Sequence, residues 1–229
     1  NFTKFAAVHY HAIMHSSLIF YIMKYKLKNS GGKNLTSEDF LKKTLGISDQ
    51  TLLCKLADAA EEKRLNRGDF VLREGEEQKE VSFLITGILR GFFIDLDGND
   101  VTDCFGFQPG DPAMTTFEIG TCSSISIVAL TKCRLLTFPV DTAIKFIENE
   151  PALMYTYNHL LTAALKRHWE IKTMLYKYTA KERYEWFLEK YPGLIDQITN
   201  KYIASFLRMS PVTLSRLKSL YKNKAAAIR

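Results

Sequence analysis

The residues best suited to chemistry in this 229-residue chain lie near its C-terminal end, in residues 198–220. Ser210 followed by Pro211 is typical of a helix start, because a serine hydroxyl caps free backbone N–H groups and proline fits the first helical position. In the helix predicted from there, apolar residues at helical spacing would face inward: Leu214, Leu217 and either Leu220 or Tyr221. An earlier helix over residues 200–207 would turn Ile203, Ala204 and Leu207 inward. The pair predicts a helix-turn-helix, with a purely structural helical hairpin as the alternative.

The outward side of the second predicted helix carries side chains that can contact DNA. They are Val212, Thr213, Ser215, Arg216 and Ser219. Arg216 can donate two hydrogen bonds to a guanine edge, while Thr213 and Val212 can contact a thymine methyl group or a base edge. Phosphate contacts are expected from hydroxyl and ammonium groups, namely Ser210, Ser215, Lys201, Lys218 and Lys222. In a helix-turn-helix, the N-terminal turn of the second helix enters the major groove.

Positive charge is concentrated around this motif. Residues 180–229 hold ten lysines or arginines and four acidic residues, whereas residues 1–179 hold 21 of each sign. No acidic side chain occurs from Lys201 onward. Because phosphate neutralisation supplies most sequence-independent affinity for DNA, a neutral body with a basic end predicts a domain that binds a polyanion. A frayed basic tail is the alternative interpretation.

Composition indicates a folded protein with room for two domains and a connector. Hydrophobic residues make up 46% and charged residues 24% of the chain, which excludes disordered and collagen-like classes. The four cysteines, at positions 54, 104, 122 and 133, form no CxxC pair. We therefore expect reduced packing residues in a cytoplasmic protein rather than a zinc, iron–sulfur or redox motif.

The first part of the chain is predicted to be helical. The uncharged segment 5–23 is interrupted by three histidines, so an amphipathic helix is favoured over a membrane span or signal peptide. A short helix is expected from Thr36, where Asp39 three residues later resembles a capping box. A further helix is expected to start near Ser48 and to end before Arg67.

The middle of the chain predicts strands. Short β-rich runs alternate with glycine-marked turns between residues 65 and 139, which is typical of an antiparallel barrel or double-sheet roll. The runs are residues 70–72, 81–85, 89–95, 101–107, 124–129 and 133–138. Asp97-Gly98 between two of them is a strong hairpin signal.

Helices are expected again beyond residue 140. One covers about residues 141–149, and a longer one runs from Pro151 to about Tyr178 without glycine or proline. Its 3.5-residue spacing of apolar residues predicts a coiled-coil dimer interface, with packing against the chain's own strands as the alternative. The dimer-interface candidates are Leu153, Tyr157, Leu160, Ala164, Ile171 and Met174.

These elements, in this order, resemble the Crp/Fnr family of bacterial transcription regulators. The resemblance spans about residues 48–220 and rests on residues 68–76 (GDFVLREGE), 81–90 (VSFLITGILR), 109–111 (PGD) and the helix-turn-helix. It implies an α+β fold with an N-terminal antiparallel β-roll (a double-stranded β-helix or jelly roll), a long dimerisation helix and a C-terminal all-α helix-turn-helix domain. It also implies that the roll senses an effector and that paired recognition helices read a two-fold symmetric operator.

The sequence departs from the nucleotide-binding members of that family. By the resemblance, a Gly-Glu pair and an arginine would hold the ribose and the cyclic phosphate. Here Met114 and Thr115 replace the pair, and Ser123 or Ser124 stands in place of the arginine. A buried phosphate without a cationic partner loses its strongest contact. We keep these four residues as effector-pocket candidates and expect an unknown small effector or none, rather than cyclic AMP or GMP.

The recognition helix departs from well-known members too. Pro211 and Val212 stand where an arginine and a glutamate would read bases, so Arg216 alone matches, and Arg208 replaces the usual turn glycine. The operator therefore cannot be transferred from those members.

Other patterns carry weaker signals. Residues 95–103 imitate a calcium loop but lack its closing glutamate, so a solvated hairpin is favoured. Single histidines that could bind a metal or a haem are His11, His15, His159 and His168, and packing or surface roles are favoured for them. No catalytic motif occurs, so neither an enzyme nor a bound cofactor or metal is expected.

The sequence thus predicts a homodimeric DNA-binding regulator, whose partner is double-stranded DNA and for which RNA polymerase is a further candidate. Its predicted parts are a helical extension (1–45), the β-roll sensor (46–140), linker and dimerisation helices (141–178) and the DNA-binding domain (179–229). The alternative is a ligand-sensing or membrane-associated signalling module anchored by residues 5–28, where Lys24, Lys26 and Lys28 adjoin the uncharged segment.

Overall fold

The computed structural model describes residues 36–115 and 121–227, with side chains up to residue 223. The chain divides into two compact units, Asn1–Asp58 and Ala59–Arg229, and each is described by itself. The sequence predictions for residues 5–28, including His11 and His15, lie outside the described residues.

The described part of the first unit is helical. Helix α2 (Ser37–Thr44) begins after Thr36, whose side chain accepts a hydrogen bond from the Asp39 amide at 3.2 Å, as the capping pattern predicted. Phe40 and Leu41 are buried on one side of α2. Helix α3 (Gln50–Ala59) follows, and the Asp49 carboxylate caps it by accepting from the Leu52 amide at 2.8 Å.

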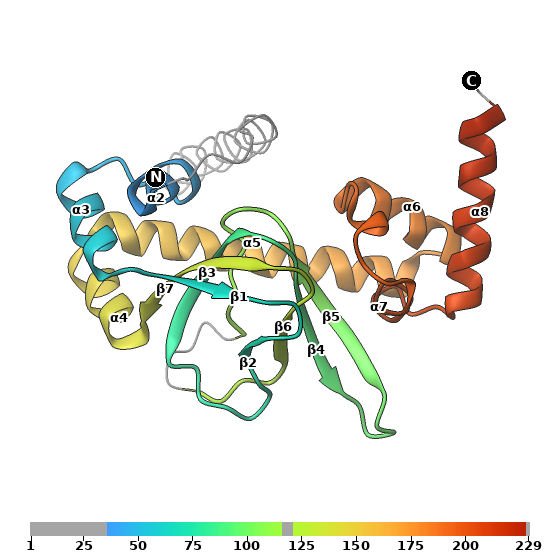
Figure 1. Cartoon of the computed structure of the whole chain (residues 1–229), viewed down its shortest axis with the longest axis horizontal. Coiled ribbons are helices and arrows are strands. Elements are labelled where there is room, and N and C mark those ends of the chain that lie inside the picture. Colours follow the sequence, from blue (N-terminus) through green and yellow to red (C-terminus); the bar gives the residue numbers. More distant parts are fainter. Residues whose placement is uncertain (1–35, 116–120, 228–229) are drawn as a thin grey trace, which may run out of the picture. The chain divides into compact units, whose positions relative to one another are not determined.

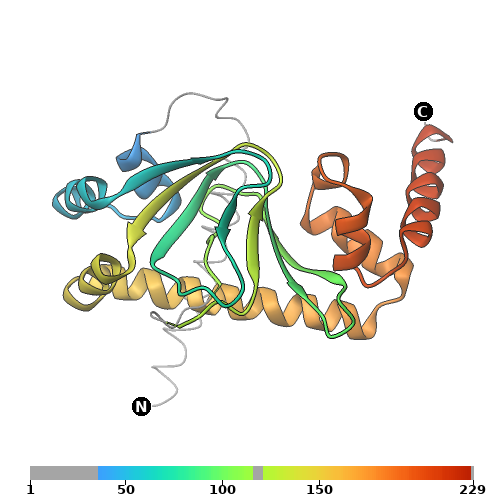
Figure 2. The ribbon, with the colours of Figure 1, turned by 60° about the horizontal axis from the view of Figure 1, so that its bottom comes forward.

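The second unit begins with two antiparallel sheets, in the strand orders β1-β7-β3 and β2-β6-β4-β5 (Figures 1 and 2). The strands are β1 (Glu61–Leu65), β2 (Phe70–Leu72), β3 (Glu80–Thr86), β4 (Leu89–Ile94), β5 (Asp100–Gly106), β6 (Ser126–Ala129) and β7 (Cys133–Pro139). Apolar side chains from both sheets form a core that includes Leu84, Leu89, Ile127 and Leu135. The predicted α+β class and antiparallel roll are confirmed.

Strand β1 corrects the prediction that the helix beginning near Ser48 would continue to residue 66. The helix ends at Ala59, and Glu61–Leu65 pair antiparallel with β7 instead. Glu62 opposes Leu136 in this register, and its carboxylate accepts hydrogen bonds from Arg134 at 2.8 and 2.7 Å. Contacts with a strand 70 residues away therefore override the local helical pattern.

Helices complete the second unit. They are α4 (Val140–Asn149), α5 (Pro151–Lys177), α6 (Ala180–Lys190), the short 3-10 helix η2 (Leu194–Asp196), α7 (Asn200–Phe206) and α8 (Pro211–Ala227). Helix α5 runs along the roll and leads to the C-terminal helices (Figures 1 and 2). Tyr178 is extended and interrupts the helical path, and α6 restarts at a capping box formed by Thr179 and Glu182.

The core of the C-terminal helices extends into the roll. Phe105 of β5 is 2% exposed, and its ring lies 5.4 Å from that of Phe206 and 6.4 Å from that of Phe187. Tyr191 joins them at 6.2 Å from Phe105, and burial raises the pKa of its phenol. The C-terminal helices are thus packed directly on strand β5.

Candidate nucleic-acid interface

Helices α7 and α8 form the predicted helix-turn-helix. Ile203, Ala204 and Leu207 of the first half and Leu214 of the second are each at most 1% exposed. Ala204 is small where the turn folds back, and its carbonyl accepts from the Met209 amide at 3.0 Å. The buried apolar side chains of both helices therefore pack against one another and stabilise the motif.

The turn between the helices places Arg208 in the left-handed region, with φ of 50°. This is the position where the sequence lacks the usual glycine. Arg183 of α6 supports the turn, since its Nη2 donates to the Arg208 carbonyl at 3.3 Å and its Nη1 to the Tyr178 carbonyl at 3.1 Å. A bulky side chain is thus accommodated at a backbone conformation that disfavours it.

Ser210 caps α8 as predicted. Its hydroxyl accepts from the Thr213 amide at 3.1 Å and lies 2.9 Å from the Thr213 hydroxyl. Thr213 is half-buried, so its hydroxyl already serves the helix start. The cap thus satisfies one of the backbone N–H groups that are free at the start of α8.

The outward face of α8 is open to solvent. Val212 is 60% exposed, and Ser215, Arg216 and Ser219 are exposed with it. Arg216 forms no ion pair among the described residues. A guanidinium, a methyl-bearing side chain and two hydroxyls thus lie on one face of α8, at spacings of three or four residues.

The choice between Leu220 and Tyr221 as the inward residue is settled by the structure. Leu220 is 59% exposed, whereas the Tyr221 ring packs 5.2 Å from that of Tyr184. The Tyr221 hydroxyl donates to Glu185, and this hydrogen bond raises the phenol pKa to about 12. Tyr221 therefore fastens α8 to α6.

The three candidate phosphate-binding lysines differ in their surroundings. Lys201 and Lys222 are exposed. Lys218 is directed into its own domain, where its Nζ donates to the Ile195 carbonyl at 2.9 Å and lies 3.8 Å from Asp196. Its side chain is 21% exposed, so Lys218 holds η2 against α8 rather than extending toward a ligand.

The effector-pocket candidates do not gather a cation. Met114 and Thr115 are half-buried, and the Thr115 amide donates to Gln78 at 3.0 Å. Ser123 is buried with its hydroxyl bonded to the Ile125 carbonyl, while Ser124 is exposed. The Ser123 hydroxyl is thus already engaged by a nearby backbone carbonyl.

Three arginines in or beside the sensor fold are paired with carboxylates. Arg134 binds Glu62, and Arg90 binds Asp100. Arg167 reaches from α5 to Asp111 of the roll at 3.4 Å, a contact that sequence reasoning missed. Asp111 is 7% exposed and also accepts from the Phe107 and Gln108 amides, each at 2.9 Å.

Part of the predicted dimer seam of α5 packs against its own chain. Leu153 and Met174 are buried, so they have little surface left for a second copy. Ile171 packs against the C-terminal core, and the remaining seam residues are half-buried: Tyr157, Leu160 and Ala164. The large exposed apolar residues of α5 lie elsewhere on its surface: Met154, Tyr155, Leu165, Trp169 and Tyr176.

Within the described residues, no three His, Cys, Asp or Glu side chains gather where they could hold a metal ion. Asp95 of the calcium-like loop accepts from the amides of Asp97 and Asn99, and these hydrogen bonds lower its pKa. In the part of the chain that is described, no helix has the length and apolar character needed to cross a membrane.

Part of the chain is similar to a known protein domain. The family model of the cyclic nucleotide-binding domain matches residues 62–150. Among curated proteins, none matches the chain in sequence.

Similar solved structures cover a larger share of the chain than the family model does. FixK2 from Bradyrhizobium japonicum is 18% identical, with a TM-score of 0.66 over 72% of this chain and 86% of its own. CLP, the c-di-GMP-responsive global regulator of Xanthomonas campestris, is 13% identical, with a TM-score of 0.62 over 77% and 93% of the two chains. A regulator from Eubacterium rectale assigned to the Crp/Fnr family is 15% identical, with a TM-score of 0.57 over 77% and 85%. Residues 62–150 are therefore similar to the cyclic nucleotide-binding domain, and the chain has the fold of the Crp/Fnr transcription regulators.

Proposed function

We propose that this protein is a cytoplasmic DNA-binding transcription regulator of the Crp/Fnr type, which binds a two-fold symmetric operator as a homodimer. The observation that carries the proposal is the first turn of α8, where Leu214 is fully buried while Val212, Ser215 and Arg216 are exposed. This is the arrangement that a recognition helix needs to reach base edges in the major groove. The excess of positive charge in residues 180–229 supports it.

A second copy of the chain would be held by α5. Met154, Leu165, Trp169 and Tyr176 are 40%, 59%, 55% and 81% exposed. They recur at intervals of 11, 4 and 7 residues, which places them on one side of an α-helix. Burying these side chains against the same stripe of a partner would remove a costly apolar surface from water. Half-buried residues of the predicted seam, such as Tyr157, would border this interface.

Control by cyclic AMP is not part of the proposal. Arg134, Arg90 and Arg167 are each paired with a carboxylate, so these three arginines are not free to bind a cyclic phosphate. A regulator without that contact would bind its operator equally well with and without cyclic AMP. An effector of other chemistry and RNA polymerase are further candidate partners.

The proposal is tested by selecting fragments from random double-stranded DNA with the purified protein. We expect a two-fold symmetric consensus. Arg216→Ala should cost about 1 to 3 kcal/mol of binding free energy on that consensus and relax specificity at one position in each half-site. Lys222→Ala should instead weaken binding to all sequences and lower the salt slope by about one.

Arg64→Ala provides a matched control. Arg64 pairs with Glu62 on the exposed edge of β1 and lies outside the helix-turn-helix, so its loss should leave DNA binding unchanged. If no consensus emerges, or if Arg216→Ala weakens consensus and random DNA equally, α8 does not read bases and the proposed function is wrong.

A further inference from the structure

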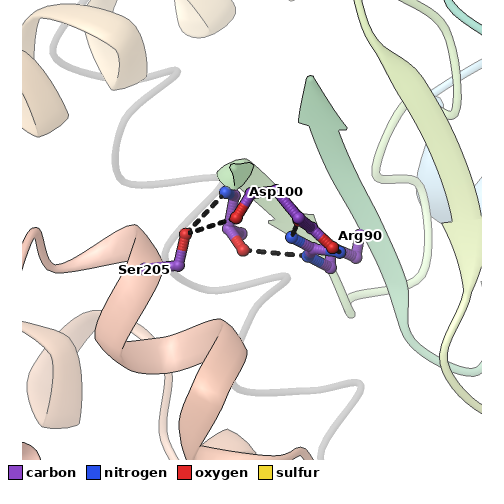
Figure 3. A network of polar contacts seen from close by, with 4 residues as sticks. Arg90, Asp100 and Ser205 are labelled. Carbon is purple, nitrogen blue, oxygen red and sulfur yellow. Dashed lines mark hydrogen bonds and ion pairs between the residues drawn. The ribbon is translucent and has the colours of Figure 1, made fainter. Parts of the chain in front are cut away.

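A buried polar cluster joins the first helix of the helix-turn-helix to the hairpin of β4 and β5 (Figure 3). Arg90 is 2% exposed, and its Nε donates to the Thr102 hydroxyl at 2.8 Å. Its two terminal nitrogens donate to the Asp100 carboxylate, one of them at 3.1 Å. Since a buried guanidinium is costly unless it is fully paired, this geometry fixes the side chain in one place.

Helix α7 closes over this cluster with two side chains. The Tyr202 ring lies against the Arg90 guanidinium, with 4.1 Å between the Arg90 Cζ and the ring centroid. The Ser205 hydroxyl accepts from the Thr102 amide at 2.9 Å and donates to the Asp100 carbonyl at 3.3 Å. Strand β5 lies at the edge of its sheet, so Ser205 bonds backbone groups that another strand would otherwise bond.

The covalent path to the helix-turn-helix does not fix its orientation by itself. Helix α5 ends at Lys177, Tyr178 is extended, and α6 begins at Ala180. A break of this kind permits rotation of the C-terminal helices unless noncovalent contacts prevent it. The described contacts that do so include the Phe105 ring packing, the packing of Ile171 and Met174 of α5 on the C-terminal core, and the polar cluster.

We propose that Arg90, Asp100, Tyr202 and Ser205 form a latch that holds the recognition helix in the orientation needed to bind both half-sites of an operator at once. This inference rests on the proposed function. The docked state leaves the outward face of α8 exposed, so docking does not block DNA. The two recognition helices of a dimer must reach half-sites about 34 Å apart. A domain that rotates freely would lose that freedom when both half-sites are bound, and the lost entropy would weaken binding. The four residues are therefore positioning residues.

The first test needs no DNA. The Thr102 amide has Ser205 as its acceptor, so its hydrogen exchange reports on docking. Ser205→Ala should speed exchange at Thr102, while the Leu84 amide, which donates to the Asp111 carbonyl at 2.9 Å, should exchange as before. Tyr202→Leu should act in the same direction. The matched control is Ser48→Ala, an exposed serine in the other unit, which should change neither rate. Because Ser205→Ala also removes the acceptor of the Thr102 amide, the deciding variant is Tyr202→Leu, and unchanged Thr102 exchange in Tyr202→Leu would overturn the latch.

The second test compares two DNA probes: the consensus selected by the wild-type protein, and a duplex that contains one half of it. Ser205→Ala should lower affinity for the full site on the order of tenfold and leave half-site affinity unchanged. The full consensus should also slow Thr102 exchange in the wild-type protein, because DNA that binds the docked state stabilises it.

Each other result contradicts the proposal. If Ser205→Ala lowered affinity equally for both probes, Ser205 would only stabilise the helix-turn-helix. If Ser205→Ala raised affinity for the full site, the docked state would be the state that does not bind DNA. Faster hydrogen exchange of the Thr102 amide after DNA is added would also mean that DNA does not bind the docked state. If the wild-type protein selects no DNA, the proposed function fails, while the exchange experiment still decides whether the latch exists.

Discussion

At the scale of single residues, the turn of the helix-turn-helix shows how an unfavourable side chain is tolerated. Arg208 adopts φ of 50°, a conformation that costs a non-glycine residue roughly 1 to 2 kcal/mol. Its carbonyl accepts from Arg183, and the buried residues on both sides hold the turn in place. The surrounding contacts therefore offset local backbone strain.

Arg208→Gly should raise the free energy of unfolding by about 0.5 to 1 kcal/mol, because glycine adopts this conformation without a steric cost. Chemical denaturation measures the change. Gly193→Ala is the converse control. Gly193 has φ of 77° and room for a methyl group, so the alanine should lower the free energy of unfolding through backbone strain alone. A destabilised Arg208→Gly protein would show that the arginine side chain makes a net stabilising contact.

The roles of single residues could be predicted only where their partners are near in sequence. Ser210 and Pro211 indicated the start of α8 because capping is local. The role of Lys218 could not be predicted, since its partner is the Ile195 carbonyl in a separate short helix. The same is true of Ser205, whose partners lie more than 100 residues away.

At the scale of elements, the start of α6 depends on a reciprocal cap. The Thr179 hydroxyl accepts from the Glu182 amide at 3.3 Å, and the Glu182 carboxylate accepts from the Thr179 amide at 2.8 Å. The hydrogen bonds that the Glu182 carboxylate accepts from the Thr179 amide and from the Thr179 hydroxyl lower its pKa from 4.5. The cap begins α6 immediately after the extended residue Tyr178.

Thr179→Ala should lower the free energy of unfolding by about 1 kcal/mol. For Glu182, the folded-state pKa lies below the unfolded one, so its contribution is present above pH 4.5 and is lost as the pH falls through the folded-state value. The stability difference between the wild-type protein and Glu182→Ala should therefore shrink between pH 7 and pH 3 in denaturant titrations. A difference that stays constant over this range would contradict an ionised cap.

Element types were predictable where apolar residues repeat with one period. The six predicted strands and α5 follow this rule, whereas β1 does not, because Glu61–Leu65 is mostly charged and is stabilised by its pairing with β7. The residue range of helix α5 could be predicted, but not which of its sides packs against the rest of the chain. It carries apolar residues on two sides, and the contacts of Arg167 and Met174 with the rest of the chain decide which side faces inward.

At the scale of the whole molecule, the exposed stripe of α5 is the surface that a second copy should cover. Leu165→Glu and Trp169→Glu should each convert dimers to monomers, because a buried carboxylate without a partner opposes association. Sedimentation velocity measures the change. Lys166→Glu, about 100° around the helix from Leu165, is the control that should leave the dimer intact. If both stripe variants remain dimeric, the second copy binds a different surface.

The packing of α7 on strand β5 has a consequence for solubility. A sheet edge with free backbone groups is a template for pairing with foreign strands, and here Ser205 and the rings around Phe105 cover part of that edge. Proteolytic loss of residues beyond 178 would uncover an aromatic surface and a strand ready to pair. The remaining sensor fragment should then aggregate. The C-terminal helices therefore also prevent the roll from aggregating through its exposed strand edge.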